Sequence, residues 1–415
     1  MPSPRRKKLL PFDRALARTL SVARRLPPET VPLRSALGRV LHGDVRSRLN
    51  IPPFDRSAMD GYAVRVADLE GASRETPAVL EVAAVLAAGH RKKQRLPAHC
   101  AARIMTGAAL PPGAEAVVMQ EYTERRGDRV RVFYPVEPGE NCGQVGEDVA
   151  RGQVVLADGR VLGPADLGML GATGRERVRV TRRPRVAVIS TGNEVVAPGG
   201  RLGPGQIHDA NGYSLLGLSS RVGADARFLG IVGDRPGALK KKLDRARKDD
   251  AILLSGGVSV GDYDLVRRQL LDLGFKEVFW RVAMKPGKPV FLGKRGKQVV
   301  FGLPGNPVSV MVVFEMLVRP YFETLVGKTR VGLPRMTATL AGRVKLRGSR
   351  RKFLRGLLAA GEGRPIVIPY VNQKSGVLRS MVECNVLIDV PGEFDELVAG
   401  DLVEVLPMEV PWETS

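Results

Sequence analysis

The pattern of apolar and polar positions changes along the chain and predicts several structural units. Between residues 185 and 327, three apolar runs are nearly continuous, as expected of parallel strands buried on both faces of a sheet: RVAVIST, ARFLGIV and AILLSGG. Amphipathic stretches with helical spacing separate them: NGYSLLGLSSRVG, PGALKKKLDRARK and DYDLVRRQLLDLG. Further strands are KEVFWRV, PVFLGK and QVVFGL, and a long apolar helix closes the unit. This order predicts a doubly wound α/β domain.

The segments on either side of this unit have different patterns. Apolar positions at helical spacing predict helices over 12–26, 33–41 and 163–174, and we expect the last to pack with the first. Between them, short valine-rich segments with intervening turns predict a β-rich module: AVLEVAAVL, ARIMTGA, AEAVVMQEY and DRVRVFYPV. Four β-prone segments near the end predict a small β-barrel or sandwich: MTATLAG, PIVIPYV, CNVLIDV and DLVEVLPM.

The chain is therefore expected to be a multidomain α/β protein with an insertion. We predict a discontinuous, mainly helical N-terminal domain and, inserted in it, the β-rich module. The α/β domain and a C-terminal β-barrel domain follow. The predicted boundaries are 1–48 with 146–180, 49–145, 181–328 and 329–415.

Composition narrows the functional classes. The chain has 415 residues, three separated cysteines and four scattered histidines, which favours neither a disulfide framework nor a histidine metal site and fits a reducing cytoplasm. No apolar stretch approaches the ~18 residues that span a membrane. The net charge of +22 fits nucleic acid, an acidic membrane surface or anionic substrates, or a solvated basic surface. Aromatic residues make up only 5% of the chain, so a stacking platform for single strands is poorly supported.

The loops that follow the predicted strands carry the candidate chemistry. Ligands of an open parallel sheet bind beyond the carboxyl ends of its strands. The loops GNE, GD, VSVGDYD, KPGKP and PGNP should all emerge on that edge. They bring together Glu194, Asp234, Asp264, Lys285 and Lys288, and Asp209 in QIHDANG is expected to join them.

The segment AILLSGGVSVGDYD shows why acids and an anion site belong together here. Gly256 and Gly261 have the spacing of a phosphate loop, but Asp262 stands where such a loop needs lysine. Gly257 and Gly305 let backbone N–H groups approach an anion closely. Carboxylates repel that anion unless a hard cation lies between them, and Mg²⁺ binds carboxylates together with phosphate oxygens. We expect a magnesium ion that in turn holds a phosphate.

Each of these motifs also has an ordinary structural interpretation. GNE and GD after strands are common turns, KPGKP can form a tight hairpin with solvated lysines, and PGNP can simply cap a helix with proline in its first turn. The cysteines and histidines are interpreted as structural.

Two polar loops fall in or beside the inserted β-rich module. IPPFDRSAMDGYA carries Asp55, Ser57 and Asp60, and MTGAALPPGAEAVV carries Thr106 in a glycine turn. If they are functional, the module must reach an α/β domain, and a second subunit could supply it.

Taken in order, the motifs resemble those of the molybdopterin molybdenumtransferase family, the bacterial molybdenum-insertion enzymes, which are similar to the E domains of plant and animal cofactor-synthesis proteins. They are PPFDRSAMDGYAV, MTGAALPPGAEAVV, GEDV, ISTGNEV, SGGVSVGDYD, KPGKP and LPGNPVS. The resemblance covers essentially the whole chain. It implies a transferase that acts on adenylylated molybdopterin and molybdate, uses Mg²⁺ and releases AMP. It also implies a cytoplasmic homodimer with active sites shared between subunits, and contact with the adenylyltransferase that supplies the substrate.

The resemblance also assigns roles to individual residues. Glu194 and Asp264 match the family's magnesium carboxylates. Positions near the nucleotide, its phosphates and the oxyanion are Ser190, Gly257, Ser259, Pro289, Gly305, Asn306, Arg355 and Ser375. Catalytic positions are Asp60, Thr106, Asp148, Asp209, Asp234, Lys285 and Lys288.

Some positions depart from the family pattern, and three other functions stay open. Arg56 stands where the family commonly has asparagine, and Lys374 and Cys384 where small residues are frequent. The alternatives are the preceding adenylyltransferase step, a non-catalytic scaffold and a basic RNA-binding protein. We expect neither a membrane nor a nucleic acid as partner.

Overall fold

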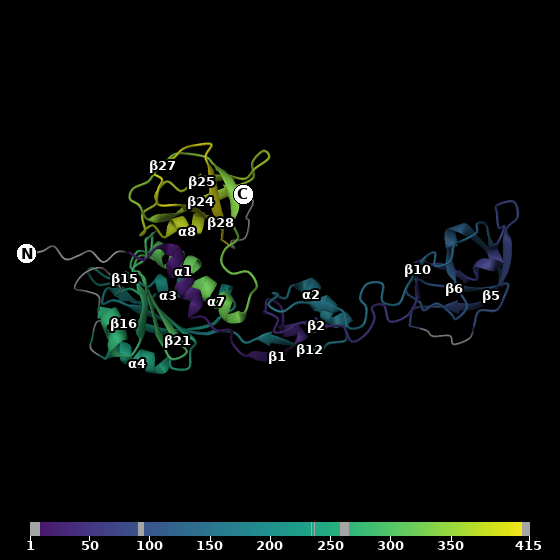
Figure 1. Cartoon of the computed structure of the whole chain (residues 1–415), viewed down its shortest axis with the longest axis horizontal. Coiled ribbons are helices and arrows are strands. Elements are labelled where there is room, and N and C mark those ends of the chain that lie inside the picture. The colour runs from purple at the N-terminus through teal and green to yellow at the C-terminus, as the bar shows by residue number, and fades with distance from the viewer. Residues whose placement is uncertain (1–8, 90–94, 234, 236, 258–264, 409–415) are drawn as a thin grey trace, which may run out of the picture.

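The protein is elongated, with two domains packed together at one end and an arm that carries a β-rich module at the other (Figure 1). The computed structural model describes residues 9–89, 95–233, 235, 237–257 and 265–408. In this part of the chain, no helix has the length and apolar character needed to cross a membrane.

The α/β domain is built on a six-stranded sheet of order β16-β13-β17-β21-β20-β18. These strands are Asp225–Val232, Arg185–Thr191, Ala251–Ser255, Gln298–Leu303, Phe291–Arg295 and Lys276–Trp280. The first four are parallel, and β20 runs antiparallel to both of its neighbours. Because β20 reverses direction, the end of β18 returns to the same edge as the ends of the parallel strands.

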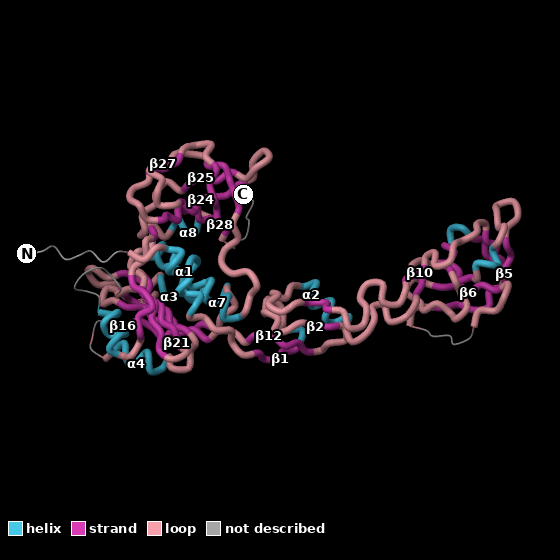
Figure 2. The backbone as a smooth tube through the Cα atoms, viewed as in Figure 1, coloured by secondary structure: helices cyan, strands magenta, loops and turns pink. Residues whose placement is uncertain are grey.

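Helices cover both faces of this sheet, as Figure 2 shows. One face packs against α1, α3, α6, the π-helical segment η4 and α7; the other packs against α4 and α5. Their bounds are Phe12–Ser21 (α1), Asn211–Arg221 (α3), Pro307–Val313 (α6), Phe314–Val318 (η4), Arg319–Val326 (α7), Ala238–Arg245 (α4) and Leu265–Asp272 (α5). Side chains of β13 alternate between the two cores, with Val186 and Val188 on one side and Ala187 and Ile189 on the other. The doubly wound fold predicted from the apolar runs is confirmed.

The C-terminal domain is a closed β-barrel. Its order is β24-β25-β22-β28-β26, and β26 pairs again with β24. The strands are Arg351–Ala359, Ile366–Pro369, Met336–Leu340, Leu402–Pro407 and Val386–Val390. A short strand from the α/β domain, β19 (Met284–Lys285), joins the barrel beside β24. Smaller elements are β23 (Val344–Lys345), β27 (Glu396–Leu397) and α8 (Arg379–Glu383).

The arm begins with a small module of paired strands and ends in the β-rich module. In the first module, β1 (Pro28–Pro32) pairs with β12 (Arg177–Thr181), and β2 (Val45–Arg46) pairs with β11 (Val154–Leu156). The helices η1 (Leu33–Ser35) and α2 (Pro164–Ala172) belong to the same module. The β-rich module has a six-stranded sheet of order β7-β4-β6-β5-β9-β8. These strands are Ala116–Met119, Gly61–Val64, Cys100–Ile104, Ala78–Leu86, Arg129–Val132 and Thr123–Arg126. Short pieces are β3 (Arg56–Ser57), β10 (Cys142–Gly143), η2 (Val66–Leu69) and η3 (Gln120–Tyr122).

Three local expectations were wrong. The helix predicted over 33–41 is only the 3-10 turn η1, because Pro32 precedes it and Gly38 turns the chain with φ 71°. α2 packs beside η1 and not with the N-terminal helix; α1 instead packs on α7, η4 and β18 of the α/β domain. The run predicted to be buried on both faces at ARFLGIV is the half-buried edge strand β16.

Candidate active-site cleft

A cleft of about 1150 Å³ lies between the carboxyl edge of the α/β sheet and the C-terminal barrel. The loops after β13, β17, β18 and β21 line one side, and the segments 344–355 and 373–375 line the other. Of the residues predicted for the site, the cleft brings together Glu194, Gly257, Lys285, Lys288, Pro289, Gly305, Asn306, Arg355 and Ser375. A volume of this size accommodates a ligand as large as a dinucleotide-like cofactor.

The floor is formed by glycine turns that no other residue could replace without strain. Gly256 and Gly257 have φ values of +92° and +67°. A Cβ at Gly256 would lie 2.5 Å from the Thr191 carbonyl oxygen, and one at Gly257 would overlap the Val266 side chain. Gly305 lies directly beside Gly256. Backbone is thus exposed to the cleft where two strands end, as expected of an anion-binding floor.

The KPGKP hairpin connects β18 to β20 and forms one wall. Lys285 belongs to β19, where it pairs with Lys352 of β24. Lys352 is almost fully buried and its Nζ donates a 2.7 Å hydrogen bond to the Gly348 carbonyl. Burial and the nearby charge of Lys285 lower the pKa of Lys352. The hairpin is therefore fixed to the barrel by backbone pairing, and this pairing holds its lysines at the cleft.

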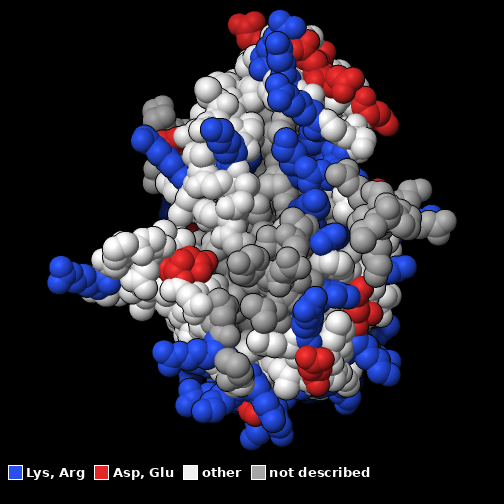
Figure 3. Space-filling model, turned by 90° about the vertical axis from the view of Figure 1, so that its left-hand side faces the viewer, with Lys and Arg blue, Asp and Glu red and all other residues white. Residues whose placement is uncertain are grey.

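The charge of the cleft is strongly positive. In addition to Lys285 and Lys288, the barrel contributes Lys374, noted above only as a departure from the family pattern, and cations that our sequence analysis did not single out: Lys345, Arg347, Arg350 and Lys352. Figure 3 shows Lys and Arg side chains running down the face of the barrel toward the α/β domain. Among the described residues of the lining, Glu194 supplies the one carboxylate. Cations gathered in a cleft with low-dielectric walls attract and retain anions.

Glu194 is well placed to meet a ligand. Its side chain is exposed at the cleft, and no hydrogen bond or ion pair to it occurs among the described residues. The carboxylate lies over Gly192, where a Cβ would come within 2.5 Å of Oε2. Gly192 has φ +137°, a conformation that other residues rarely adopt. The turn therefore leaves the carboxylate available for binding.

Arg355 and Ser375 do different things in the cleft wall. Ser375 accepts a 2.9 Å hydrogen bond from Asn306 Nδ2, which ties the barrel to the PGNP loop. The Arg355 guanidinium is directed into its own domain. It donates hydrogen bonds of 3.0–3.1 Å to the Ser380 hydroxyl and to three backbone carbonyls, those of residues 372–374. This geometry gives Arg355 the role of holding the loop that carries Ser375.

Ser190 and Asp209 lie beneath the floor and not in the cleft lining. Both are buried and flank Gly212, and within the described part of the chain Ser190 Oγ and Asp209 Oδ2 have no hydrogen-bond partner. Asp209 Oδ1 accepts a 2.9 Å bond from the Gly212 N–H. Nearby, Asn211 Nδ2 donates a 2.7 Å bond to the Gly305 carbonyl. Asn211 therefore supports the floor, and only its place at the start of a helix after QIHDA could have suggested it.

Asp60 directly precedes β4, Thr106 follows β6 and Asp148 follows β10. β6 and β10 lie at the end of the arm, away from the α/β domain and the barrel that form the cleft (Figure 1). Asp60 Oδ1 accepts hydrogen bonds from the Thr106 N–H at 2.7 Å and from its hydroxyl at 2.8 Å. These bonds lower the pKa of Asp60, with the backbone bond contributing most. Asp148 is exposed where the chain returns from the module.

Family profiles match nearly the whole chain. The MoeA N-terminal region (domain I and II) matches residues 10–174, the probable molybdopterin binding domain matches 187–324 and the MoeA C-terminal region (domain IV) matches 337–408. A molybdopterin molybdenumtransferase 2 of Mycobacterium tuberculosis is 38% identical, covering 91% of this chain and 94% of the relative. The chain belongs to the molybdopterin molybdenumtransferase family.

Other relatives agree over similar lengths. Molybdopterin molybdenumtransferases of Haemophilus influenzae and Bacillus subtilis are 36% and 32% identical, covering 91% and 97% of this chain and 93% and 96% of theirs. The crystal structure of a molybdopterin biosynthesis moeA protein from Pyrococcus horikoshii superposes with a TM-score of 0.84 at 34% identity, covering 96% of this chain and 99% of that one. Members of the molybdopterin molybdenumtransferase family are transferases of molybdenum cofactor biosynthesis, so the resemblance inferred from the motifs is confirmed.

Three residues that the family pattern assigns to the site lie outside the described residues: Asp234, Ser259 and Asp264. The last two belong to the VSVGDYD loop, which follows Gly257 at the cleft floor. Their family roles stay predictions.

Proposed function

We propose that this protein inserts molybdate into adenylylated molybdopterin and releases AMP. The observation that carries the proposal is the cleft: a glycine floor, one available carboxylate and a ring of cations, placed at the ligand-binding edge of an α/β sheet in a molybdopterin molybdenumtransferase. Both substrates are anions, so the cations supply attraction and charge neutralisation.

The described residues divide the task by position. The floor at Gly256, Gly257 and Gly305 presents backbone to the phosphates of the nucleotide part. Lys285 and Lys288, held against the barrel, bind the oxyanion and offset negative charge that develops when the phosphoanhydride breaks. No side-chain nucleophile is required, because an oxygen of molybdate or of water attacks the pterin-side phosphorus of the anhydride, the P–O bond to AMP breaks and AMP leaves with the bridging oxygen. The two dithiolene sulfurs bind molybdenum as a molybdate oxygen leaves as water with the two thiol protons.

Of the two predicted magnesium ligands, the structure describes Glu194, and this residue suits a magnesium ion. The Glu194 carboxylate faces the cleft without a competing partner, and its hard oxygen atoms suit Mg²⁺. Asp264 would complete the pair. When bound, Mg²⁺ polarises a phosphoryl oxygen. Within the described residues, no cluster of three or more potential metal ligands occurs, so we expect the ion to bind together with the substrate phosphates.

The arm gives a reason to propose a homodimer. Asp60 and Thr106 form a rigid, exposed pair that cannot reach the cleft of their own chain. We place them in the cleft of a second copy, where the ionised Asp60 would orient the pterin. We also place the reaction in the cytoplasm, where the three free cysteines stay reduced and the adenylyltransferase can hand over its product.

The test is an AMP-release assay with purified protein, adenylylated molybdopterin, molybdate and Mg²⁺. We expect AMP in proportion to the pterin supplied. If the protein bound the pterin and left AMP attached, the proposal would fail and a scaffold function would remain.

The shared site has its own test by subunit mixing. Asp60→Asn and Lys288→Ala homodimers should both be inactive, whereas a mixed dimer has one cleft with both wild-type residues. Recovery of activity on mixing supports the shared site, and absence of recovery with mixed dimers present contradicts it.

A further inference from the structure

A second pocket, of about 430 Å³, lies where the arm joins the α/β domain. The chain crosses this junction twice, and both crossings line the pocket: Arg24, Arg25, Leu26 and Pro27 on the way out, and Arg182 on the way back. The remaining wall belongs to the β20–β21 turn and to α7. We call it the junction pocket; it is at the edge of the sheet opposite the cleft, where β20 ends and β21 begins.

The junction is rigidly built around the pocket. Arg25 makes a bidentate ion pair with Asp158 of the arm, at 2.6 and 2.7 Å, and donates a 2.9 Å bond to the Leu41 carbonyl. The Leu26 N–H bonds to the Leu325 carbonyl at 2.8 Å. Arm and domain are thus connected across the pocket by specific contacts, so a ligand would meet a preformed site.

The charges of the junction pocket are unbalanced. Asp250, the one acid among the described residues of its lining, accepts two 2.7 Å hydrogen bonds from Arg182 and one of 2.8 Å from the Arg185 N–H, so its charge is already neutralised. Lys294 is half-buried, and the side-chain ammonium groups of Lys294 and Lys297 have no hydrogen bond or ion pair among the described residues. Exposed Arg24 adds a third cation of this kind. Cations held together without counter-charges in a pocket attract an anion.

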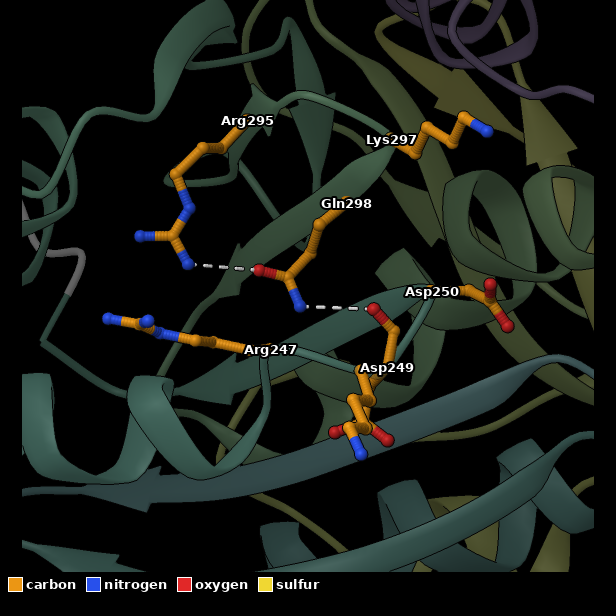
Figure 4. A pocket seen from close by; sticks show the side chains of 7 residues that line it. Arg247, Asp249, Asp250, Arg295, Lys297 and Gln298 are labelled. Carbon is orange, nitrogen blue, oxygen red and sulfur yellow. Dashed lines mark hydrogen bonds between the residues drawn. The ribbon is translucent and has the colours of Figure 1, made fainter.

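Figure 4 shows the adjoining depression, which shares Asp250 and Lys297 with the junction pocket. Lys297 and Asp250 extend to one side of the β20–β21 turn, and Arg295 and Arg247 extend to the other. The Arg295 guanidinium is already hydrogen-bonded within the protein, because it donates to Gln298 Oε1 at 3.2 Å and to a backbone carbonyl at 3.0 Å. Arg247 is paired with Asp244 at 2.8 Å. Among the described residues, the cations of this depression whose side chains have no hydrogen bond or ion pair are therefore Lys248 and Lys297, and Lys297 also lines the junction pocket.

The opposite wall of the pocket is apolar and aromatic. Leu26, Leu325 and Tyr321 are at most 8% exposed in the whole chain, yet they border the pocket. Burial raises the pKa of the Tyr321 phenol, so its hydroxyl stays a hydrogen-bond donor at neutral pH. A ligand that fills this space must carry an anionic group at one end and a flat or apolar group at the other.

We propose that the junction pocket binds a phosphorylated small molecule of about nucleoside monophosphate size, with its phosphate on Lys294, Lys297 and Arg24 and its apolar part on Tyr321 and Leu325. The site is separate from the cleft and independent of the proposed function. Since its walls come from both sides of the junction, the ligand would link the arm to the α/β domain.

The test is isothermal titration of the full-length protein with AMP as the probe. We expect two sites in the wild type. The double variant Lys294→Ala/Lys297→Ala should lose one of them or weaken it at least ten-fold, and Lys288→Ala should instead affect the cleft site. Lys248→Ala is the matched control, because Lys248 lines only the adjoining depression; its affinities should stay within two-fold of the wild type.

The outcomes separate the two sites. If Lys288→Ala removes all AMP binding and the double variant removes none, the junction pocket does not bind nucleotide and the inference is wrong. If the double variant removes a site and Lys288→Ala has no effect, the inference stands and the nucleotide role of the cleft is in question. AMP should also bind the junction pocket more tightly than inorganic phosphate or adenosine; equal affinity for phosphate would overturn the proposed apolar contact. Arg24→Glu, with circular dichroism to verify folding, should weaken the same site.

Discussion

The variant Arg355→Met distinguishes two roles of the Arg355 guanidinium: direct binding of the oxyanion, and positioning of the barrel groups that bind it. The side chain is only 1% exposed and donates four hydrogen bonds to the loop and to α8. At about 1 kcal/mol net for each bond, Arg355→Met would cost up to about 4 kcal/mol. Two effects offset part of this cost. The released loop carbonyls can bind water, and the variant no longer buries the charge of Arg355, whose pKa is lowered by desolvation. We therefore expect a loss of about 2–3 kcal/mol in local stability.

Hydrogen exchange measures this loss where it arises. Amides of the loop 372–378 should exchange roughly 30- to 150-fold faster in Arg355→Met, since each 1.4 kcal/mol is about ten-fold in an opening equilibrium. The KM for molybdate should rise because Ser375 and Lys374 lose their positions. Arg364→Met is the control: Arg364 is exposed on the same barrel and its side chain makes no hydrogen bond or ion pair with the described residues, so exchange and kinetics should be unchanged.

A different result would refute the positioning role. If exchange of the loop were unchanged while the KM for molybdate rose strongly, the guanidinium would have to turn and bind the oxyanion directly, as the family resemblance suggested.

Three further predictions concern the cleft and the arm. Glu194→Gln should reduce AMP release at least 100-fold without changing the thermal unfolding midpoint, because the carboxylate has no hydrogen-bond or ion-pair partner among the described residues; a substantial drop in the midpoint would show a structural role. Lys345→Gln/Arg347→Gln should weaken binding of the anionic substrate by about ten-fold at low salt and by much less at 0.5 M salt, since the attraction is screened; an effect independent of salt would contradict the electrostatic account. Thr106→Val should raise the pKa of Asp60 toward its ordinary value in an NMR titration, since hydrogen bonds from Thr106 lower it. The stability added by the hydroxyl bond is present above the unfolded-state pKa and is lost as pH falls through the lower folded value. Thr106→Val keeps the backbone bond, so the variant should still lose stability over this range, but less than the wild type.

The sheet and the edge that binds ligands were predictable because buried parallel strands are nearly pure apolar runs. β13 and β17 read as RVAVIST and AILLS, and glycine turns follow where they end. Because the strands run in the same direction, the loops that follow them lie at one edge of the sheet, and this can be predicted without knowing how the side chains pack.

The barrel strand β24 escaped prediction because its sequence, RKFLRGLLA, has buried charges where the pattern expects apolar residues. Lys352 and Arg355 are both about 1% exposed. Lys352 donates to the carbonyl of Gly348, in the turn that precedes the strand, and Arg355 donates to carbonyls of a loop that is remote in sequence. No local rule anticipates such partners. The partner of α1 escaped for a related reason: an amphipathic helix shows that one face is buried, but not which domain covers it.

The basic residues of the cleft could not be distinguished by sequence. The chain has 65 lysines and arginines, and Lys345, Arg347, Arg350 and Lys374 follow no motif that sets them apart. Only closure of the barrel over the sheet edge gathers them, through the pairing of β19 with β24. In contrast, the two polar loops that carry Asp60 and Thr106 were each recognisable in the sequence, although only the structure shows that these residues are hydrogen-bonded to each other.

We propose that the oxyanion, molybdate, binds in the cleft between the KPGKP hairpin and the barrel. The most direct test is anomalous diffraction from crystals soaked in molybdate. We predict a molybdenum peak within hydrogen-bonding distance of Lys285 or Lys288, on the side that faces Lys345–Arg350. A molybdenum peak outside this cleft, or none there at saturating molybdate, would contradict the account.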